Sequence, residues 1–348
     1  MRELGYWACA VLLLGFSSPS VSQEDEDVQK RIQAQFRGYG ERLTNVSEAK
    51  IAAAKEIGEY ARNVHSFVYH LSRLLDRDRD PKVRSEAART LGVVGPTAVS
   101  LDKAVLTGLS KALDDPDDDL RLAAVRAMAL MAPYSKAALP KVIPIITKDK
   151  KTAIRHAAIY VVVRLGPDAN EAVPALLEAL NDPDPGMPAG ATSVRNYAMI
   201  ALGLMGPGAK DAAEPLLNLK NTFGDDELQG LRLGTLTKII PKDKRLMPLL
   251  RENLKTKERQ ALRASAAWAI KNLAPEGREA IPDLIAALKA TDVKEKEVDS
   301  RIKRTIIMAL GEFGPLAKDA IPAIQAATPV GDESLAEAAI KKIRGQGQ

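Results

Sequence analysis

Few residues of this sequence have the types and spacing that chemistry requires. His65 and His70 are five residues apart, so they would lie on different faces of a helix, and neither belongs to a His-Glu-x-x-His zinc motif. His156 follows an arginine, at a position where a comparable segment carries Asn196. The single cysteine, Cys9, lies in the N-terminal apolar stretch. No Gly-x-Ser-x-Gly, phosphate-binding or dinucleotide-binding motif occurs, so the sequence predicts no catalytic residue, no cofactor and no metal ligand.

Two acidic turns, 76–80 and 115–119, have the alternate spacing of calcium ligands. An EF-hand loop would need glycine at its sixth position and glutamate at its twelfth. The first turn has Pro81 and Ala87 at those positions, and the second has Leu120 and Arg126. The pattern therefore favours helix N-caps in both turns, with a weak calcium site as the alternative.

Charge and aromatic content argue against a nucleic-acid partner. The formal net charge is only +5, and the basic clusters 148–151 and 242–245 each contain an aspartate and no aromatic residue on which a base could stack. Trp268, the only tryptophan after Trp7, follows Ala267 in an apolar helical pattern. Packing in the core is the simpler prediction for Trp268, and a partner-binding residue is the alternative.

These residues belong to a sequence that repeats itself over most of its 348 positions. A basic residue, called the anchor here, opens a helical pattern in each repeat, and successive anchors are 31 to 40 residues apart. Apolar residues recur four and seven positions after the anchor, which places them on one helix face. The anchors are Lys50, Arg84, Arg121, Arg155, Arg195, Arg232, Arg263 and Lys303.

Glycine and proline mark the end of each first helix and the start of a second. Pairs such as Gly95-Pro96 and Gly314-Pro315 follow the first helix, because a proline cannot continue it. A second proline, such as Pro140 or Pro282, comes a few residues later and suits the first turn of the next helix. The pattern predicts antiparallel helix pairs, including helices near 50–60, 64–75, 83–94, 102–113 and 120–131.

The segments 194–207 and 280–285 resemble HEAT repeats, particularly the bacterial phycobilisome-lyase-like subtype. The resemblance implies an all-α fold, an α-solenoid in which stacked helix pairs form a superhelix and the anchors bond acidic turn residues of neighbouring repeats. It also implies that second helices line a groove, which would place Ala179 and Ala286 toward a partner. The alternative is that small residues at these positions only permit tight superhelical curvature. Near Arg232 the early Ile240-Pro241 predicts a shortened first helix.

Four regions are predicted along the chain. Residues 1–22 resemble a signal peptide, with Arg2 before an apolar run and small residues up to Ser22, although an uncleaved membrane tether is the alternative. Residues 23–45 are predicted to form a capping helix, 46–343 the solenoid, and 344–348 a disordered tail. No other segment is expected to span the membrane.

The sequence predicts a non-catalytic scaffold for a protein or peptide partner, exported to the periplasm or the cell exterior. A lyase-like enzyme, or a partner subunit of one, is the alternative that the repeat subtype suggests. Met187, in the long connection after Asn181, joins Trp268, Ala179 and Ala286 as a predicted partner contact. The oligomeric state stays open.

The export signal gives the first test. We expect the native protein to begin near Gln23, because the apolar run and the small residues before this position have the form of a cleavable signal. N-terminal sequencing of the native protein, together with cell fractionation, measures both properties. Protein that begins at Met1 and is found entirely in the cytosol would contradict the prediction.

Overall fold

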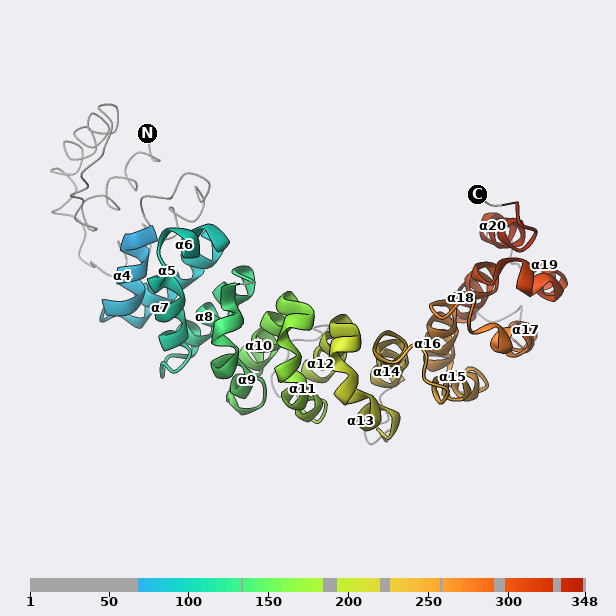
Figure 1. Cartoon of the computed structure of the whole chain (residues 1–348), viewed down its shortest axis with the longest axis horizontal. Helices are drawn as coiled ribbons and strands as arrows, with labels where there is room; N and C mark the ends of the chain where they lie inside the picture. The colour runs from blue at the N-terminus through green and yellow to red at the C-terminus, as the bar shows by residue number, and fades with distance from the viewer. Residues whose placement is uncertain are drawn as a thin grey trace, which may run out of the picture. The chain divides into compact units, whose positions relative to one another are not determined.

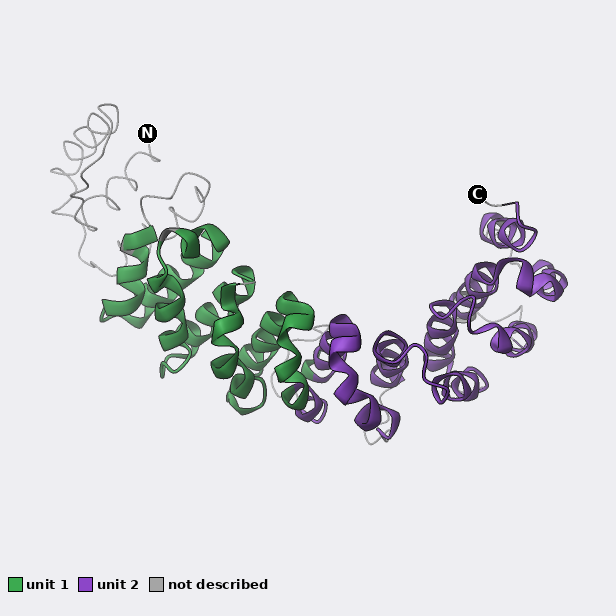
Figure 2. Ribbon diagram, in the orientation of Figure 1, with its two compact units in different colours: residues 1–175, 183–194 green, residues 176–182, 195–348 purple. Residues whose placement is uncertain are grey.

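The structure is a computed structural model that describes residues 68–132, 134–183, 193–219, 226–256, 259–290, 298–327 and 333–346. Helices and turns account for the described residues, and no strand occurs among them. The predicted signal peptide, the capping helix and the helix at 50–60 lie outside these ranges. The chain divides into two compact units, residues 1–175 with 183–194 and residues 176–182 with 195–348 (Figure 2).

Unit 1 consists of paired helices connected by short turns (Figure 1). The first helices α5, α8 and α10 pack side by side in chain order, and the second helices α4, α7 and α9 pack against them. The elements are α4 (Val68–Arg77), α5 (Pro81–Val94), α6 (Pro96–Leu101), α7 (Ala104–Ala112), α8 (Asp118–Leu130), the 3₁₀ helix η3 (Tyr134–Ala138), α9 (Leu139–Lys148), α10 (Thr152–Leu165) and η4 (Gly166–Ala172). Helix α11 (Val173–Ala179) crosses the division between the units.

Unit 2 has the same organisation. The first helices α14, α16 and α18, followed by α20, pack in one row, and the second helices α15, α17 and α19 form another. The elements are α12 (Val194–Met205), η5 (Gly206–Ala212), α13 (Ala213–Leu217), α14 (Asp226–Ile239), α15 (Leu246–Leu254), α16 (Gln260–Lys271), η6 (Arg278–Ala280), α17 (Ile281–Lys289), α18 (Val298–Glu312), η7 (Gly314–Ala320), α19 (Ile321–Ala327) and α20 (Glu333–Ile343). None of the helices within the described ranges is both long and apolar enough to span a membrane.

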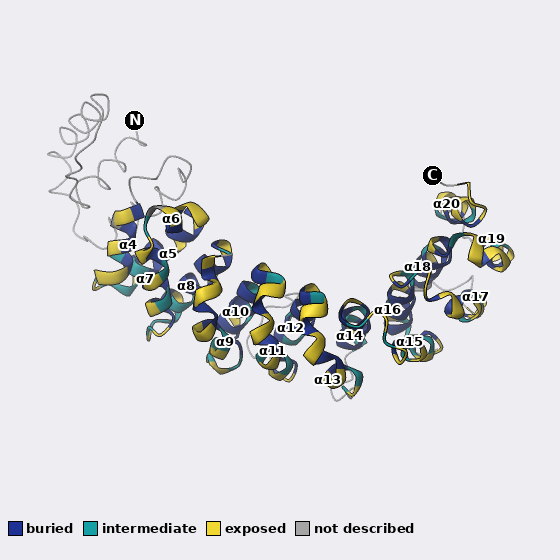
Figure 3. Ribbon diagram, in the orientation of Figure 1, coloured by how far each residue is buried: buried dark blue, intermediate teal, exposed yellow. Residues whose placement is uncertain are grey.

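The buried face of each first helix is the one that the repeat predicts (Figure 3). Every described residue four or seven positions after an anchor is at most 3% exposed. Because these positions recur at helical spacing, each first helix turns one apolar stripe toward its neighbours. The residues are Ala88, Leu91, Val125, Met128, Ile159, Val162, Met199, Leu202, Leu236, Ile239, Ala267, Ile270, Ile307 and Leu310.

The predicted helix ends also occur in the structure. The glycines of four Gly-Pro pairs have φ between 54° and 67°, a left-handed conformation that side chains disfavour. The proline after each glycine opens α6 or a 3₁₀ helix (η4, η5 and η7), and these short segments were not predicted. The second proline lies in the first turn of helices such as α9 and α17. The four glycines are Gly95, Gly166, Gly206 and Gly314.

The acidic turns provide helix N-caps. The backbone N–H of Lys82 donates to Asp80 Oδ1 over 2.9 Å at the start of α5, and Leu120 N–H donates to Asp117 Oδ1 over 2.8 Å in α8. Each carboxylate satisfies an N–H group that has no partner inside its helix. The capping interpretation is therefore confirmed for Asp80 and Asp117.

Two predictions about the helices and the chain terminus require correction. Helix α14, which contains Arg232, has 14 residues, as many as α5 and α10, so its predicted shortening is wrong. The early Pro241 shortens the connection instead, because a turn at Asp243 takes the place of a 3₁₀ helix. Arg245 donates both side-chain and backbone hydrogen bonds to Asp243 and lowers the pKa of this carboxyl to about 2.

The predicted disordered tail begins as an ordered helix cap. The N–H of Gln346 donates to Lys341 O, and the N–H of Gly345 donates to Lys342 O, with Gly345 at a φ of 72°. This pair of bonds is a Schellman motif, which closes the carbonyl end of α20. Order therefore extends to Gln346, three residues into the predicted tail.

Arg84 and Arg121 connect consecutive repeats in unit 1. Arg84 donates to the carbonyl of Asp78 and to Asp115 Oδ2, both over 2.9 Å. Arg121 donates to the carbonyl of Asp115 over 2.9 Å and to Asp149 Oδ2 over 2.9 Å. Each arginine thus binds a carbonyl of the turn before its own helix and the acidic turn of the following repeat.

The remaining anchors use other contacts. Arg155 donates to the carbonyl of Asp149 over 2.9 Å, and Arg263 donates to the carbonyls of Leu254 and Ala287. Arg232 donates to the carbonyls of Leu216 and Leu217 and to Gln229 Oε1 (2.9 Å). Burial lowers the pKa of the Arg232 guanidinium. Arg195 is half-buried and Lys303 is buried.

The Arg121 contacts give a stability prediction. We expect Arg121→Ala to lower the free energy of unfolding by about 1.5–3 kcal/mol, because the substitution removes hydrogen bonds to a mostly buried carboxylate. Lys136→Ala is the matched control, since its ion pair with Asp168 is more than half exposed and should contribute less than about 1 kcal/mol. Denaturant unfolding measures both variants, and equal losses would contradict a structural role for the anchor.

Candidate partner-binding pocket

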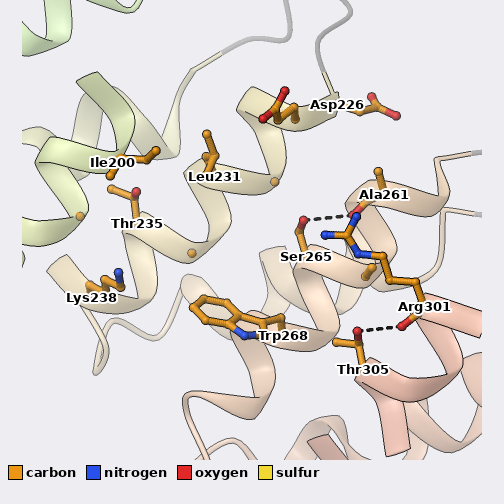
Figure 4. A pocket seen from close by; sticks show the side chains of 15 residues that line it. Ile200, Asp226, Leu231, Thr235, Lys238, Ala261, Ser265, Trp268, Arg301 and Thr305 are labelled. Atoms are coloured by element: carbon orange, nitrogen blue, oxygen red, sulfur yellow. Dashed lines mark hydrogen bonds between the residues drawn. The ribbon is translucent and has the colours of Figure 1, made fainter. Parts of the chain in front are cut away.

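A surface pocket of about 600 Å³ lies on the first helices of unit 2 (Figure 4). Its walls come from α12, α14, α16 and α18, each belonging to a different repeat. The pocket's size falls within the range of small-molecule and peptide sites, and its walls combine apolar, hydroxyl and charged side chains. The lining residues are Ile200, Gly203, Asp226, Glu227, Gly230, Leu231, Gly234, Thr235, Lys238, Ala261, Ala264, Ser265, Trp268, Arg301 and Thr305.

Glycines allow the helices around the pocket to pack closely. A Cβ atom at Gly230 would overlap the side chain of Ser265, and one at Gly203 would lie 2.9 Å from Thr235 Oγ1. At Gly234 a Cβ atom would meet only the Trp268 ring, at an ordinary 3.4 Å. Ser265 and Trp268 therefore lie directly against α14, because this helix has no side chain at two successive turns.

Trp268 is the large apolar residue of this pocket. Its side chain is 41% exposed, whereas Ala266, Ala267 and Ala269 of the same helix are fully buried. The prediction that Trp268 packs in the core is wrong, because it lies five positions after Arg263, on the helix face opposite the core. An exposed indole costs free energy in water that a partner's apolar contact would recover.

Charged groups lie around the indole from two helices. Lys238, near the carboxyl end of α14, and Arg301, on α18, are both exposed. Asp226 and Glu227 lie at the opposite end of α14, where Arg259 Nε donates to Asp226 Oδ1 over 2.7 Å. The Lys238 and Arg301 side chains have no carboxylate partner in the part of the chain that the structure describes.

The hydroxyl groups of the pocket already donate to backbone carbonyls. Ser265 Oγ donates to Ala261 O over 3.0 Å, Thr305 Oγ1 to Arg301 O over 2.8 Å, and Thr235 Oγ1 to Met199 O over 3.0 Å. Activation of a hydroxyl nucleophile needs a base within hydrogen-bond distance, and these donors face carbonyls instead. Their oxygen atoms still have lone pairs that can accept a hydrogen bond.

The other predicted partner contacts are not part of this pocket. Ala179 is only 2% exposed, so a partner cannot reach it and that prediction is wrong. Ala286 is exposed on α17, which is a second helix, whereas the pocket is formed by first helices. Met187 lies outside the described residues. The resemblance placed the partner on the second helices, but the described pocket with an exposed tryptophan is on the first helices.

Sequence reasoning missed Lys238 and Arg301 as site residues. A signal was present in the repeat register: Trp268 and Ile200 both lie five positions after an anchor, and Gly230 and Gly234 flank Arg232 by two positions on either side. An alignment of the outward-facing positions of successive repeats, in addition to the buried ones, would have identified the surface that carries this pocket.

Comparisons with known proteins identify the repeats. HEAT repeats match residues 45–129 and 106–192, and the PBS lyase HEAT-like repeat matches residues 262–290. The chain therefore contains HEAT repeats, as the sequence predicted, and its fold is an all-α solenoid. A comparison with curated proteins finds no match.

Solved structures with a similar fold are importin-type proteins. The chain is 14% identical to importin beta in an ammonium sulfate condition, with a TM-score of 0.50, and 98% of this chain aligns with 62% of that one. For Kap95 in its complex with Nup1, the identity is 10% and the TM-score 0.53, with 99% and 57% covered. For Kap95p with RanGDP, the identity is 12% and the TM-score 0.52, with 98% and 56% covered. The chain thus spans about three fifths of these proteins, and the likeness concerns the fold.

The exposure of Trp268 can be measured directly. In a full-length Trp7→Phe chain, in which Trp268 is the only tryptophan, we expect acrylamide to quench the emission appreciably, because much of the indole contacts solvent. N-acetyltryptophanamide provides the fully exposed standard. A blue-shifted emission that acrylamide does not quench would show that Trp268 is buried.

Proposed function

We propose that this protein is a non-catalytic scaffold that binds another protein and acts after export from the cytoplasm. The observation that carries the proposal is the Trp268 pocket, in which four repeats supply an apolar ring, hydrogen-bond acceptors and charge to one surface. Tryptophan and arginine are the side chains most enriched where protein partners bind tightly.

Two comparisons support a protein partner. The structures of Kap95 with Nup1 and of Kap95p with RanGDP are HEAT solenoids in complexes with proteins. A solenoid offers a long surface in which each repeat contributes a few side chains, and this arrangement suits a polypeptide ligand. The partner of the present chain is defined by its own pocket residues, because a shared fold does not transfer a partner.

Non-catalytic action is supported by the chemistry of the pocket lining. Ser265 and Thr305 donate to carbonyls of their own helices, and neither histidine nor cysteine is among the described lining residues. Export is supported by the apolar run and small residues of the first 22 positions.

The lyase-like alternative has one observation in its favour, the match of a PBS lyase HEAT-like repeat to residues 262–290. This segment forms α16 and α17, and its match describes how a helix pair is built. A repeat type that positions helices does not by itself supply a reacting group. The scaffold is therefore the proposal that we adopt.

Capture and reconstitution test the scaffold proposal. Immobilised full-length protein should retain a defined set of proteins from the envelope fraction of its native source, and heat-unfolded protein should not retain them. At least one captured protein, purified separately, should form a complex of fixed stoichiometry with the chain in size-exclusion chromatography with light scattering. Failure of every captured protein to form such a complex would contradict the proposal.

A further inference from the structure

We infer that the Trp268 pocket binds an extended segment of the partner polypeptide in which an acidic residue lies next to a proline or an aliphatic residue. This inference rests on the proposed scaffold function and specifies the chemistry that the scaffold recognises. It also assigns recognition to the first helices of unit 2.

The arrangement of the walls favours an extended segment. Four parallel-running first helices contribute to the pocket, and packed helices are about 8–10 Å apart, so the lined surface crosses roughly 24–30 Å. An extended chain advances about 3.4 Å per residue, so about seven to nine residues would cross it. Gly230 and Gly234 let Ser265 and Trp268 lie directly against α14, so these two side chains form part of the surface that the segment would cross.

The charges favour an acidic residue in that segment. Lys238 and Arg301 are exposed on either side of Trp268, as Figure 4 shows, and both lack a carboxylate partner among the described residues. Of the two pocket acids, Asp226 already pairs with Arg259, which leaves only Glu227 against the two cations. A carboxylate near the indole would therefore meet a positive potential, and arginine can bind it with two hydrogen bonds.

The indole and the hydroxyl of Ser265 complete the recognition. A proline or aliphatic side chain next to the acid would cover the exposed Trp268 ring and remove apolar surface from water. Ser265 Oγ, whose hydrogen already bonds Ala261 O, can accept a hydrogen bond from a backbone N–H of the bound segment. Shape, charge and backbone bonding thus point to one kind of ligand.

A random library of linear twelve-residue peptides tests this inference. Peptides selected on the full-length Trp7→Phe chain should be enriched in Asp or Glu beside Pro, Leu, Ile or Val. A synthetic copy of an enriched peptide should change the Trp268 emission on titration. The Trp268→Ala substitution should raise the dissociation constant of the peptide complex at least about tenfold. Fluorescence anisotropy of the labelled peptide measures this constant.

Two further variants test separately the charges of the pocket and the space inside it. Lys238→Glu combined with Arg301→Glu should weaken binding at least about tenfold and reverse its salt dependence, because salt then screens a repulsion. Gly234→Leu should block the pocket while the fold remains, because its Cβ atom would make only an ordinary contact with Trp268. Unchanged circular dichroism and melting temperature verify that fold.

Leu316→Ala combined with Lys318→Glu is the matched control. Both residues are exposed on η7, outside the pocket lining, and this variant should bind the peptide as the parent chain does. Enrichment of basic peptides, or of peptides that bind Trp268→Ala equally well, would overturn the inference while leaving the scaffold proposal intact. Enrichment of no peptide would also overturn it, and the separate reconstitution experiment then decides whether the scaffold proposal fails too.

Discussion

The structure depends on one constraint: a single helix pair is too small to bury its own apolar face. Within each unit the first helices therefore pack against one another, as α5, α8 and α10 do in unit 1 and α14, α16 and α18 in unit 2. This packing buries the positions four and seven after the anchor. Burial at such an interface leaves backbone carbonyl groups of the turns without a hydrogen-bond donor from their own helix. The anchor arginines supply the missing donors, and Arg232 shows the extreme case, in which a buried guanidinium with a lowered pKa binds two carbonyls and a glutamine oxygen.

The close packing of the first helices also shapes the Trp268 pocket. Helices approach closely where one of them carries glycine, as at Gly230 beside Ser265 and at Gly234 beside the Trp268 ring. The Trp268 ring lies against Gly234 and stays partly exposed, in place of filling a gap in the core. The glycines that permit this close packing are therefore themselves part of the pocket lining.

The proposed partner site lies where the repeats differ from one another. The buried positions are similar in all the repeats that the structure describes, because each first helix buries the same apolar face against its neighbours. The outward positions are Ile200, Lys238, Trp268 and Arg301 in the four first helices that line the pocket, and they share neither size nor charge. Selectivity for one partner needs such differences, since a uniform surface would offer the same contacts to every segment of a ligand.

The sequence by itself determined the helix pairs, their ends and their buried faces, because these depend on neighbours within a few positions. Anchor spacing, Gly-Pro pairs and apolar residues three or four apart are all local signals. Only the tertiary structure decided that Trp268 is exposed and that Lys238 and Arg301 lie beside it, because these residues come from repeats whose anchors are 31 and 40 residues apart. Their proximity depends on how closely α14, α16 and α18 pack, and that distance is set by contacts such as Gly230 against Ser265, which no local pattern specifies.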